Sequence, residues 1–257
     1  YGLDVWRTLN GRHARAIRHS DLVVGISQYT IRRAREFNPW LDGVRHCPLG
    51  IREGLAEDGE AELRAALGFA PTCHDILVVG RMAKGEGQKG HRELIQAMTR
   101  VVREVPDARL IVAGSGDDVD TYREMARQTS AAERILFCGY VPDPLLRTLY
   151  RRVGVFAMPS RQEGFGLVYL EAMAAGLPCV ASPWDAAGEV VLDGQTGVLV
   201  DPSDQDALVR ALTTLLSDED LRKRLGRQGR KRFEAQFTEA CFHQRFWALL
   251  EEVIQRR

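Results

Sequence analysis

From about residue 74 onward, short apolar runs alternate with stretches in which apolar residues recur every three or four positions. The runs are short and nearly continuous, as in strands that are buried on both faces of a parallel sheet. The stretches between them have the spacing of amphipathic helices. This pattern predicts strands at 76–80, 109–113, 135–138, 153–158, 178–181 and 197–200, and helices at 92–105, 119–128, 144–152, 167–175 and 204–216.

Such alternation predicts a doubly wound, Rossmann-like α/β fold, in which ligands bind at the carboxyl ends of the strands. A smaller alternation precedes it, with helices at 7–19 and 29–37 and strands at 22–27 and 44–47. The chain also opens at Tyr1, without Met and inside a pattern, so we expect it to be cut. Our interpretation divides the chain into the end of one α/β unit (1–52), a complete unit that begins with a linker (53–236), and a last helix capped by Thr238 (237–257).

The bulk composition fits a folded globular protein. The 257 residues are 45% hydrophobic and 27% charged, which is enough apolar material for a sizeable core. Basic and acidic residues number 35 each, and this balance does not call for a nucleic-acid partner. Five scattered cysteines form no C-x-x-C pair, so we expect neither disulfides nor a zinc site and favour a reducing cytoplasm. No apolar run approaches the ~20 residues that a membrane-spanning helix needs.

One predicted strand–loop–helix segment combines closely spaced glycines with two carboxylates. A loop flanked by Gly164 and Gly166 can bring backbone N–H groups close to an anion, and the helix that starts near Leu167 adds its partial positive charge. Glu163 and Glu171 lie eight positions apart and can reach different hydroxyls of one polar ligand. Taken alone, such glycines also serve plain turns, and a glutamate near a helix start is often only a partner of the helix dipole.

A glycine-rich basic loop follows the first strand of the complete unit. It opens with Gly80 and Arg81 and closes with Lys89 and Gly90. Fixed cations at this place can stabilise a diphosphate leaving group without a metal ion. The alternative is an ordinary solvated loop, and Lys84 competes with Lys89 for the role.

The span from Glu163 to Glu171 matches the E-x7-E pattern of glycosyltransferase family 4, the large retaining group with the GT-B fold. The continuation at 172–178 resembles that family's helix-to-strand passage almost residue for residue. The basic loop resembles the family's phosphate-binding segment, although it is longer than in most members. We prefer Lys89 over Lys84 because a glycine and a helix follow it, as in the family.

The resemblance implies transfer of a sugar from a GDP- or UDP-linked donor to a growing polysaccharide or a lipid-linked glycan, with retention at the anomeric carbon. It implies no metal and no cofactor. Arg81 and Lys89 would stabilise the leaving diphosphate, and Glu171 would bind the ribose. The remaining donor contacts would come from Glu163 and the N–H groups near Gly164, Phe165, Gly166 and Leu167, from Gly80, and from main-chain groups near Tyr140 and Val141, which resemble the family's base-binding turn.

Two departures and one decoy accompany the resemblance. Relatives often have a histidine near the position of Tyr1, and many have two glycines where this chain has Asp185 and Ala186. Asp118 and Asp120 form the D-x-D of metal-dependent glycosyltransferases of another fold. We interpret Asp118 instead as the cap of a helix.

Other functions stay open on the sequence alone. A related GT-B enzyme could hydrolyse or epimerise nucleotide sugars, and the chain could be a catalytically silent nucleotide-binding module. The basic runs near both ends are interpreted as solvated helix faces. The alternative is peripheral contact with an anionic membrane at the inner face of the cell, worth ~1 kcal/mol per basic residue. These runs comprise Arg7, Arg12, Arg15 and Arg18, and then Arg222, Lys223, Arg224, Arg227, Arg230, Lys231 and Arg232.

Overall fold

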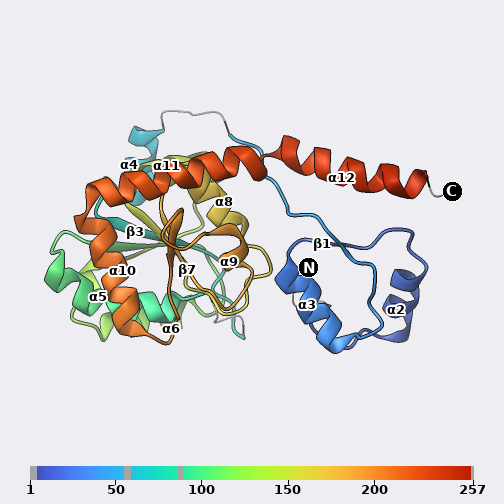
Figure 1. Ribbon diagram of the computed structural model, residues 1–257. Coiled ribbons are helices and arrows are strands. Elements are labelled where there is room, and N and C mark those ends of the chain that lie inside the picture. The colour runs from blue at the N-terminus through green and yellow to red at the C-terminus, as the bar shows by residue number, and fades with distance from the viewer. Residues whose placement is uncertain (1–4, 55–58, 86–88, 256–257) are drawn as a thin grey trace.

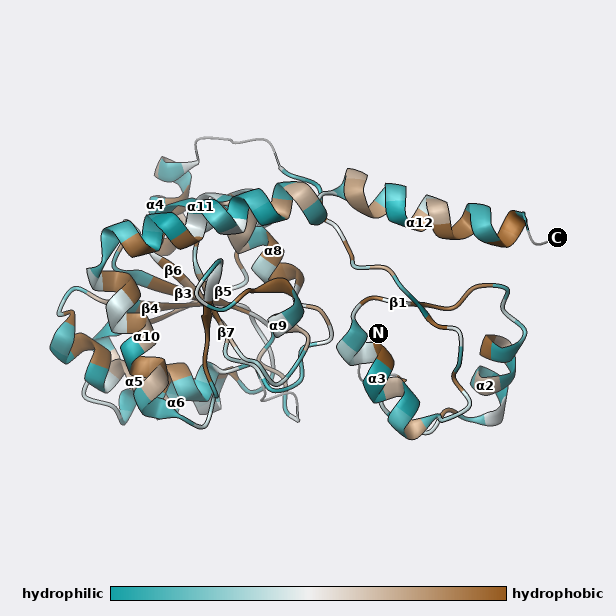
Figure 2. Ribbon diagram, in the orientation of Figure 1, coloured by the Kyte–Doolittle hydropathy of each residue, from teal (hydrophilic) through white to brown (hydrophobic). Residues whose placement is uncertain are grey.

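The computed structural model describes residues 5–54, 59–85 and 89–255, and Tyr1 therefore lies outside the described residues. A six-stranded parallel sheet covered by helices forms the large unit (59–237), and two helices with a two-stranded parallel sheet form the small unit (5–50) (Figure 1). The α/β fold with parallel sheets is confirmed. In Figure 2 the central strands of the large unit are mostly hydrophobic and the outer helix faces mostly polar, as burial of both sheet faces requires.

The large sheet has the strand order β5-β4-β3-β6-β7-β8, with every neighbouring pair parallel. The chain begins in the middle of the sheet, winds outward to one edge, and returns to wind outward to the other. This order creates a topological switch point between β3 and β6, where loops leave in opposite directions and open a crevice. The strands are β3 (Asp75–Val79), β4 (Arg109–Ala113), β5 (Ile135–Gly139), β6 (Val155–Ala157), β7 (Cys179–Ala181) and β8 (Gly197–Leu199).

The helices of the large unit follow the predicted periodicity closely. One helix without a predicted counterpart, α4 (Glu60–Leu67), buries only Leu63 and so has almost no apolar stripe. Its signals were acidic residues in the first turn and Gly68 after the last, which adopts a left-handed φ of 77°. The other elements are α5 (His91–Glu104), α6 (Val119–Arg127), η1 (Ala132–Arg134), α7 (Asp143–Arg152), α8 (Leu167–Ala174), α9 (Ala187–Val190), α10 (Gln205–Ser217) and α11 (Glu219–Gln236).

The small unit is shorter in its elements than predicted. Its first helix begins at Gly11 rather than near residue 7, because the Asn10 side chain accepts a hydrogen bond from the N–H of His13 and so caps the helix there. Its strands pair over only two residues each. The elements are α2 (Gly11–Arg18), β1 (Val24–Gly25), α3 (Gln28–Phe37) and β2 (Arg45–His46).

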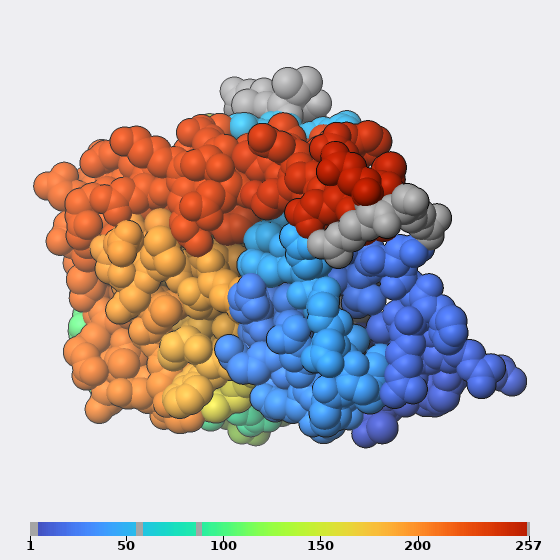
Figure 3. Space-filling model, turned by 45° about the vertical axis from the view of Figure 1, so that its right-hand side comes forward, coloured from blue at the N-terminus to red at the C-terminus, as the bar shows by residue number. Residues whose placement is uncertain are grey.

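The last helix, α12 (Glu239–Ile254), starts at Thr238, whose hydroxyl accepts from the N–H of Cys241 as a cap. It leaves the large unit and lies over the small one (Figures 1 and 3). Where it begins, it pairs with the segment that connects the two units: Ile51 donates its N–H to the carbonyl of Phe237 at 3.0 Å, and Glu239 donates to that of Ile51 at 2.9 Å. The two chain crossings between the units therefore lie side by side.

The basic run on α11 is not a uniformly solvated face, which corrects the interpretation from sequence. Arg222 donates to the carbonyls of Leu215 and Leu216, where α10 ends. Arg230 donates to the carbonyl of Ala174, and Arg232 lies against α9. Lys223, Arg224, Arg227 and Lys231 are exposed as expected. Among the described residues, no helix combines the length and the apolar character that crossing a membrane requires.

We expect His91 to make the fold sensitive to acid. Its side chain is 2% exposed and packs 5.3 Å from the Tyr122 ring, and burial, aided by the nearby charge of Lys89, lowers its pKa to about 4. An unfolded histidine takes up its proton near pH 6.5. The contribution of neutral His91 to the free energy of unfolding is therefore complete above that pH and is lost as the pH falls toward 4. Between pH 7 and pH 5 the wild type should lose about 2 kcal/mol relative to His91→Phe, measured by urea unfolding. Parallel losses in both proteins would contradict this.

Candidate functional site

The crevice at the switch point brings together the two loops that carry most of the predicted site residues. The loop after β3 contains Arg81 and Lys89, and the β6–α8 loop (158–166) contains Glu163. Lys89 donates from Nζ to Oε2 of Glu163 at 2.7 Å, and both side chains are largely buried. Gly80 lies beneath this pair, since a Cβ there would be 3.1 Å from Cδ of Lys89. The arrangement leaves a cation and a carboxylate facing each other at the carboxyl edge of the sheet.

The competing cation lies elsewhere in the same loop. The backbone N–H of Lys84 donates to the Asp117 carboxylate at 2.9 Å, and the residue is exposed. Arg81 is also exposed. Of the two lysines, Lys89 is the one that meets Glu163, which favours it for a role in the crevice.

A left-handed glycine shapes the β6–α8 loop. Gly166 has a φ of 89°, and a Cβ at this position would lie 2.4 Å from the ring of Tyr169. The Tyr169 ring is fully buried and its hydroxyl donates to the carbonyl of Met158 at the end of β6. Only glycine fits here, because any side chain would meet both steric strain and this ring. Glu163 precedes this turn, and its side chain lies over the turn because Oε1 accepts a hydrogen bond from the N–H of Gly164 at 3.1 Å.

The structure adds a buried carboxylate, Asp185, which the sequence marked only as a departure from the family pattern. Its side chain accepts from the Ser160 hydroxyl at 2.7 Å, the N–H of Glu163 at 2.8 Å and the N–H of Ala187 at 2.9 Å. The N–H of Ala186 binds the Glu163 carbonyl at 3.1 Å. Burial raises the pKa of Asp185 to about 6 despite these hydrogen bonds. Asp185 and Ala186 thus hold both main-chain groups of Glu163.

Glu171 opens onto a different hollow. A pocket of about 770 Å³ lies between α7, α8 and the segment 51–54, and its described lining includes Glu171 but neither Lys89 nor Glu163. The Tyr150 hydroxyl donates to Oε2 of Glu171 at 2.9 Å. Burial raises the pKa of Glu171, and the hydrogen bond from Tyr150 lowers it in part. The carboxylate is therefore fixed in position on the wall of this pocket.

The remaining predicted residues differ in their exposure. Tyr140 is 73% exposed after β5, whereas Val141 beside it is buried. Leu167 is exposed at the start of α8, and Phe165 is buried against Phe237, with ring centroids 6.2 Å apart.

Asp118 occupies the N-cap position of α6, but its side chain makes no capping hydrogen bond, so the predicted cap is wrong in that respect. Asp120 pairs with Arg123 at 3.3 Å on the exposed side of the helix. Across the described ranges, no group of three or more side chains is arranged to hold a metal ion.

Removing the hydroxyl of Tyr150 should weaken ligand binding at Glu171. Tyr150→Phe keeps the buried ring but leaves the carboxylate without its donor, which raises its pKa further and lets it turn away. We expect the Kd of a nucleotide that uses Glu171 to rise about fivefold at pH 7, as the loss of about 1 kcal/mol implies, and to rise more at pH 5.5. Calorimetry at both pH values measures this. An unchanged Kd would exclude Glu171 from the ligand contacts.

A doubly wound unit with charged groups at its switch point is a type of α/β fold that commonly binds polar ligands at the carboxyl ends of its strands. Residues 60–232, which include both loops, Asp185 and Glu171, match the family described as "Glycosyl transferases group 1". The chain belongs to this family of glycosyltransferases.

Curated relatives include enzymes named for mannose transfer. The chain is 36% identical over 222 residues to the GDP-mannose-dependent alpha-(1-6)-phosphatidylinositol monomannoside mannosyltransferase of Mycolicibacterium smegmatis, covering 82% of this chain and 57% of that protein. It is 33% identical over 243 residues to the GDP-mannose-dependent monoacylated alpha-(1-6)-phosphatidylinositol monomannoside mannosyltransferase of Corynebacterium glutamicum, covering 90% and 62%. The chain thus spans about three-fifths of the length of these relatives.

Among solved structures, the Anabaena protein HepE in complex with UDP superposes with a TM-score of 0.80 at 21% identity, covering 96% of this chain and 71% of that one. At this identity the likeness concerns the fold. It confirms the GT-B type of architecture predicted from the sequence.

Proposed function

We propose that the protein transfers a sugar from a nucleotide diphosphate sugar to a glycan or lipid-linked acceptor, with retention of the anomeric configuration and without a metal ion. The Lys89–Glu163 pair at the switch point carries the proposal. Departure of a nucleoside diphosphate builds negative charge on its outer phosphate, and a fixed ammonium stabilises that charge without reorganising. Lys89 supplies this cation, and Arg81 in the same loop supplies a second.

The other predicted residues take the remaining parts of the donor. Glu163 and the N–H groups at the start of α8 bind the sugar and its phosphate, since a helix start attracts anions and a carboxylate binds hydroxyls. Glu171 binds the ribose at the mouth of its pocket. Gly80, Tyr140 and Val141 complete the nucleotide contacts. No protein base is assigned, because the leaving phosphate can accept the acceptor's proton.

A GDP-linked sugar, with mannose as the first candidate, is the donor that we propose. Two relatives at 33–36% identity are named for GDP-mannose, and the matched region contains the residues assigned to the donor. The same names point to an acceptor that is a lipid-linked mannoside. An acceptor of this kind would place the protein in the cytoplasm at the membrane surface, and the exposed Arg12, Arg15 and Arg18 on α2 offer cations for anionic headgroups.

Calorimetric titration with GDP, UDP and ADP, with and without EDTA, tests the proposal. We expect GDP to bind, the binding to survive EDTA, and Lys89→Ala to weaken it. Incubation of the full-length protein with GDP-mannose and a lipid-linked mannoside should then give one product, whose anomeric proton reports retention by NMR.

Each alternative predicts a different result. Release of free sugar, or a changed sugar, without an acceptor would indicate a hydrolase or an epimerase. Nucleotide binding without any turnover would indicate a silent binding module. Binding that EDTA abolishes would contradict the metal-independent route, and no binding of any nucleotide at millimolar concentration to the full-length protein would contradict the donor site itself.

A further inference from the structure

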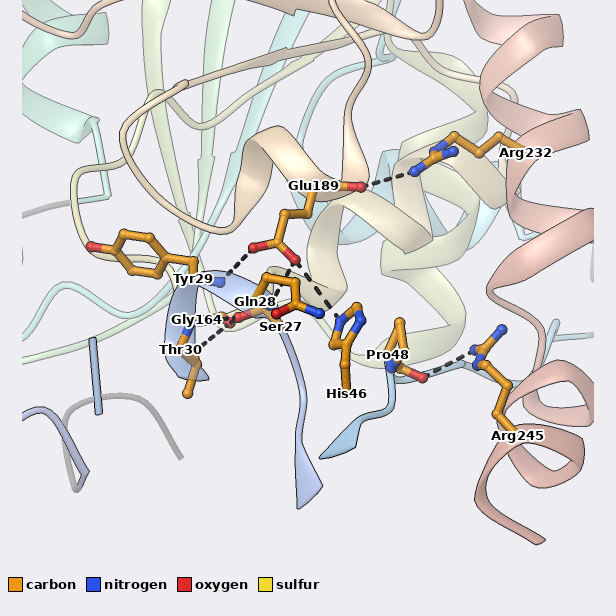
Figure 4. Close-up of polar contacts among 10 residues, drawn as sticks. All are labelled: Ser27, Gln28, Tyr29, Thr30, His46, Pro48, Gly164, Glu189, Arg232 and Arg245. Atoms are coloured by element: carbon orange, nitrogen blue, oxygen red, sulfur yellow. Dashed lines mark hydrogen bonds and ion pairs between the residues drawn. The ribbon is translucent and has the colours of Figure 1, made fainter. Parts of the chain in front are cut away.

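The small unit is docked to the large one through the start of α3. The first N–H groups of a helix have no partner within the helix. In α3, the N–H groups of Gln28 and Tyr29 donate to Oε2 and Oε1 of Glu189, at 2.9 Å and 2.6 Å (Figure 4). Glu189 belongs to α9 of the large unit, 160 residues further along the chain. One carboxylate thus satisfies two unpaired helix donors across the boundary between the units.

The same end of α3 holds the β6–α8 loop directly. The hydroxyls of Ser27 and Thr30 both donate to the carbonyl of Gly164, at 2.7 Å and 3.0 Å (Figure 4). Ser27 is fully buried at this contact and also caps α3 by accepting from the N–H of Thr30. Gly164 directly follows Glu163, so the small unit fixes the backbone next to the carboxylate of the crevice.

Glu189 is itself held on a short, well-anchored segment. Arg232 of α11 donates to the carbonyl of Glu189 at 2.8 Å (Figure 4). It also donates to the carbonyl of Val190 at 3.0 Å. Four residues earlier in the chain, Asp185 binds the N–H of Glu163. The segment 185–189 therefore connects the main chain of Glu163 at one end with α3 at the other.

The contacts of the Glu189 carboxylate all lie on the small unit. Within the described residues they are Gln28, Tyr29 and, at 3.9 Å, Nε2 of His46. These contacts indicate that the Glu189 carboxylate joins the two units and does not stabilise α9 alone. Figure 3 shows the small unit, in blue, against the segment that follows β7, in light orange.

We propose that Glu189 is a positioning residue that docks α3 onto the β6–α8 loop, so that Gly164 and Glu163 reach the geometry for sugar transfer only when the small unit is seated. The proposal rests on the proposed function, since it assigns Glu163 to the donor sugar. Lys89 and Glu171, which we assign to the diphosphate and the ribose, both belong to the large unit. We therefore expect the binding of GDP to depend less on the seated small unit than sugar transfer does.

Glu189→Ala and Glu189→Gln in the full-length protein test this by hydrogen exchange, nucleotide calorimetry and steady-state kinetics. In Glu189→Ala, we expect amide exchange to rise about tenfold or more at residues 28–31 and 163–166 and to stay unchanged in β3 and β4, because local undocking opens only those segments. We expect kcat to fall about tenfold or more while the Kd of GDP changes less than twofold. Glu189→Gln keeps one acceptor oxygen and should give intermediate values.

Glu36→Gln is the matched control. Glu36 lies on the same helix and pairs with Arg33 three residues away on its exposed surface, so its replacement should leave both exchange and kcat at the wild-type values. Unchanged exchange at 28–31 in Glu189→Ala would overturn the docking, as would a rise spread evenly over the large sheet. A wild type that binds no nucleotide and transfers no sugar would overturn the proposed function instead, while the exchange pattern would still decide the docking.

Discussion

Lys89→Ala is expected to lower kcat about 10²- to 10³-fold, the loss typical of removing one preorganised group that stabilises developing charge. Nζ of Lys89 lies 2.7 Å from Oε2 of Glu163 in the crevice at the switch point. Its removal takes away the cation for the leaving diphosphate. It also leaves the mostly buried carboxylate of Glu163 without a neutralising cation, so that this carboxylate repels the same phosphate. Steady-state kinetics with the donor sugar measures the loss, and thermal unfolding confirms that the variant folds.

Lys84→Ala is the matched control for this prediction. It removes an identical charge from the same loop, but the Lys84 side chain is exposed, and the bond to Asp117 within the described part of the loop is made by its backbone N–H. Its kcat should stay within about twofold of the wild type, because a solvated charge contributes little. Equal losses of kcat in both variants would show that the total charge of the loop matters and not the position of Lys89. A loss of kcat confined to Lys84→Ala would reverse the assignment of the two lysines.

Gly166→Ala should both destabilise the protein and abolish tight donor binding. A left-handed φ of 89° costs a residue with a Cβ about 1–2 kcal/mol, and contact at 2.4 Å with the buried ring of Tyr169 adds about 1–3 kcal/mol of overpacking. The ring has nowhere to move, because its hydroxyl is bound to Met158 at the end of β6. The loop must shift instead, and we expect the Kd of the donor to rise more than about tenfold for a displacement of this size.

Gly176→Ala is a control that separates the backbone strain of a left-handed φ from the steric clash with Tyr169. Gly176 also has a left-handed φ, 74°, but no atom lies within 4 Å of the Cβ that alanine would add. It should therefore lose only the backbone cost of about 1–2 kcal/mol and keep the donor Kd of the wild type. Equal losses of donor binding in the two variants would show that the loop responds to stability alone, and not to the space beside Tyr169.

Periodicity predicted the large unit well, because strands buried on both faces and amphipathic helices leave strong patterns. Boundaries at 109–113 and 119–127 agree with the expected elements to within one residue. The small unit was harder, since its strands pair over two residues and its first helix is set by the cap at Asn10 rather than by an apolar stripe.

The candidate site residues were named from the sequence, but the contacts between them were not. Lys89 and Glu163 were assigned to different parts of the ligand, and their contact spans 74 positions that no local pattern links. Asp185 is recognisable only by the three donors that converge on it, two from the β6–α8 loop and one from its own segment. The partner of Glu189 lies in a helix that precedes it by 160 residues, so only the folded chain reveals the docking.

The pairing of Ile51 with the start of α12 limits how the units can move. The chain crosses between them at 51 and again at 237–239, and the two crossings are hydrogen-bonded to each other. Gly50 allows this close approach, since a Cβ there would lie 2.3 Å from the carbonyl of Thr238. Two chain segments that are hydrogen-bonded to each other at one place act as a single pivot. Any change in the relative position of the units must keep these two crossings together, which favours rotation about residues 51 and 237–239 over sliding.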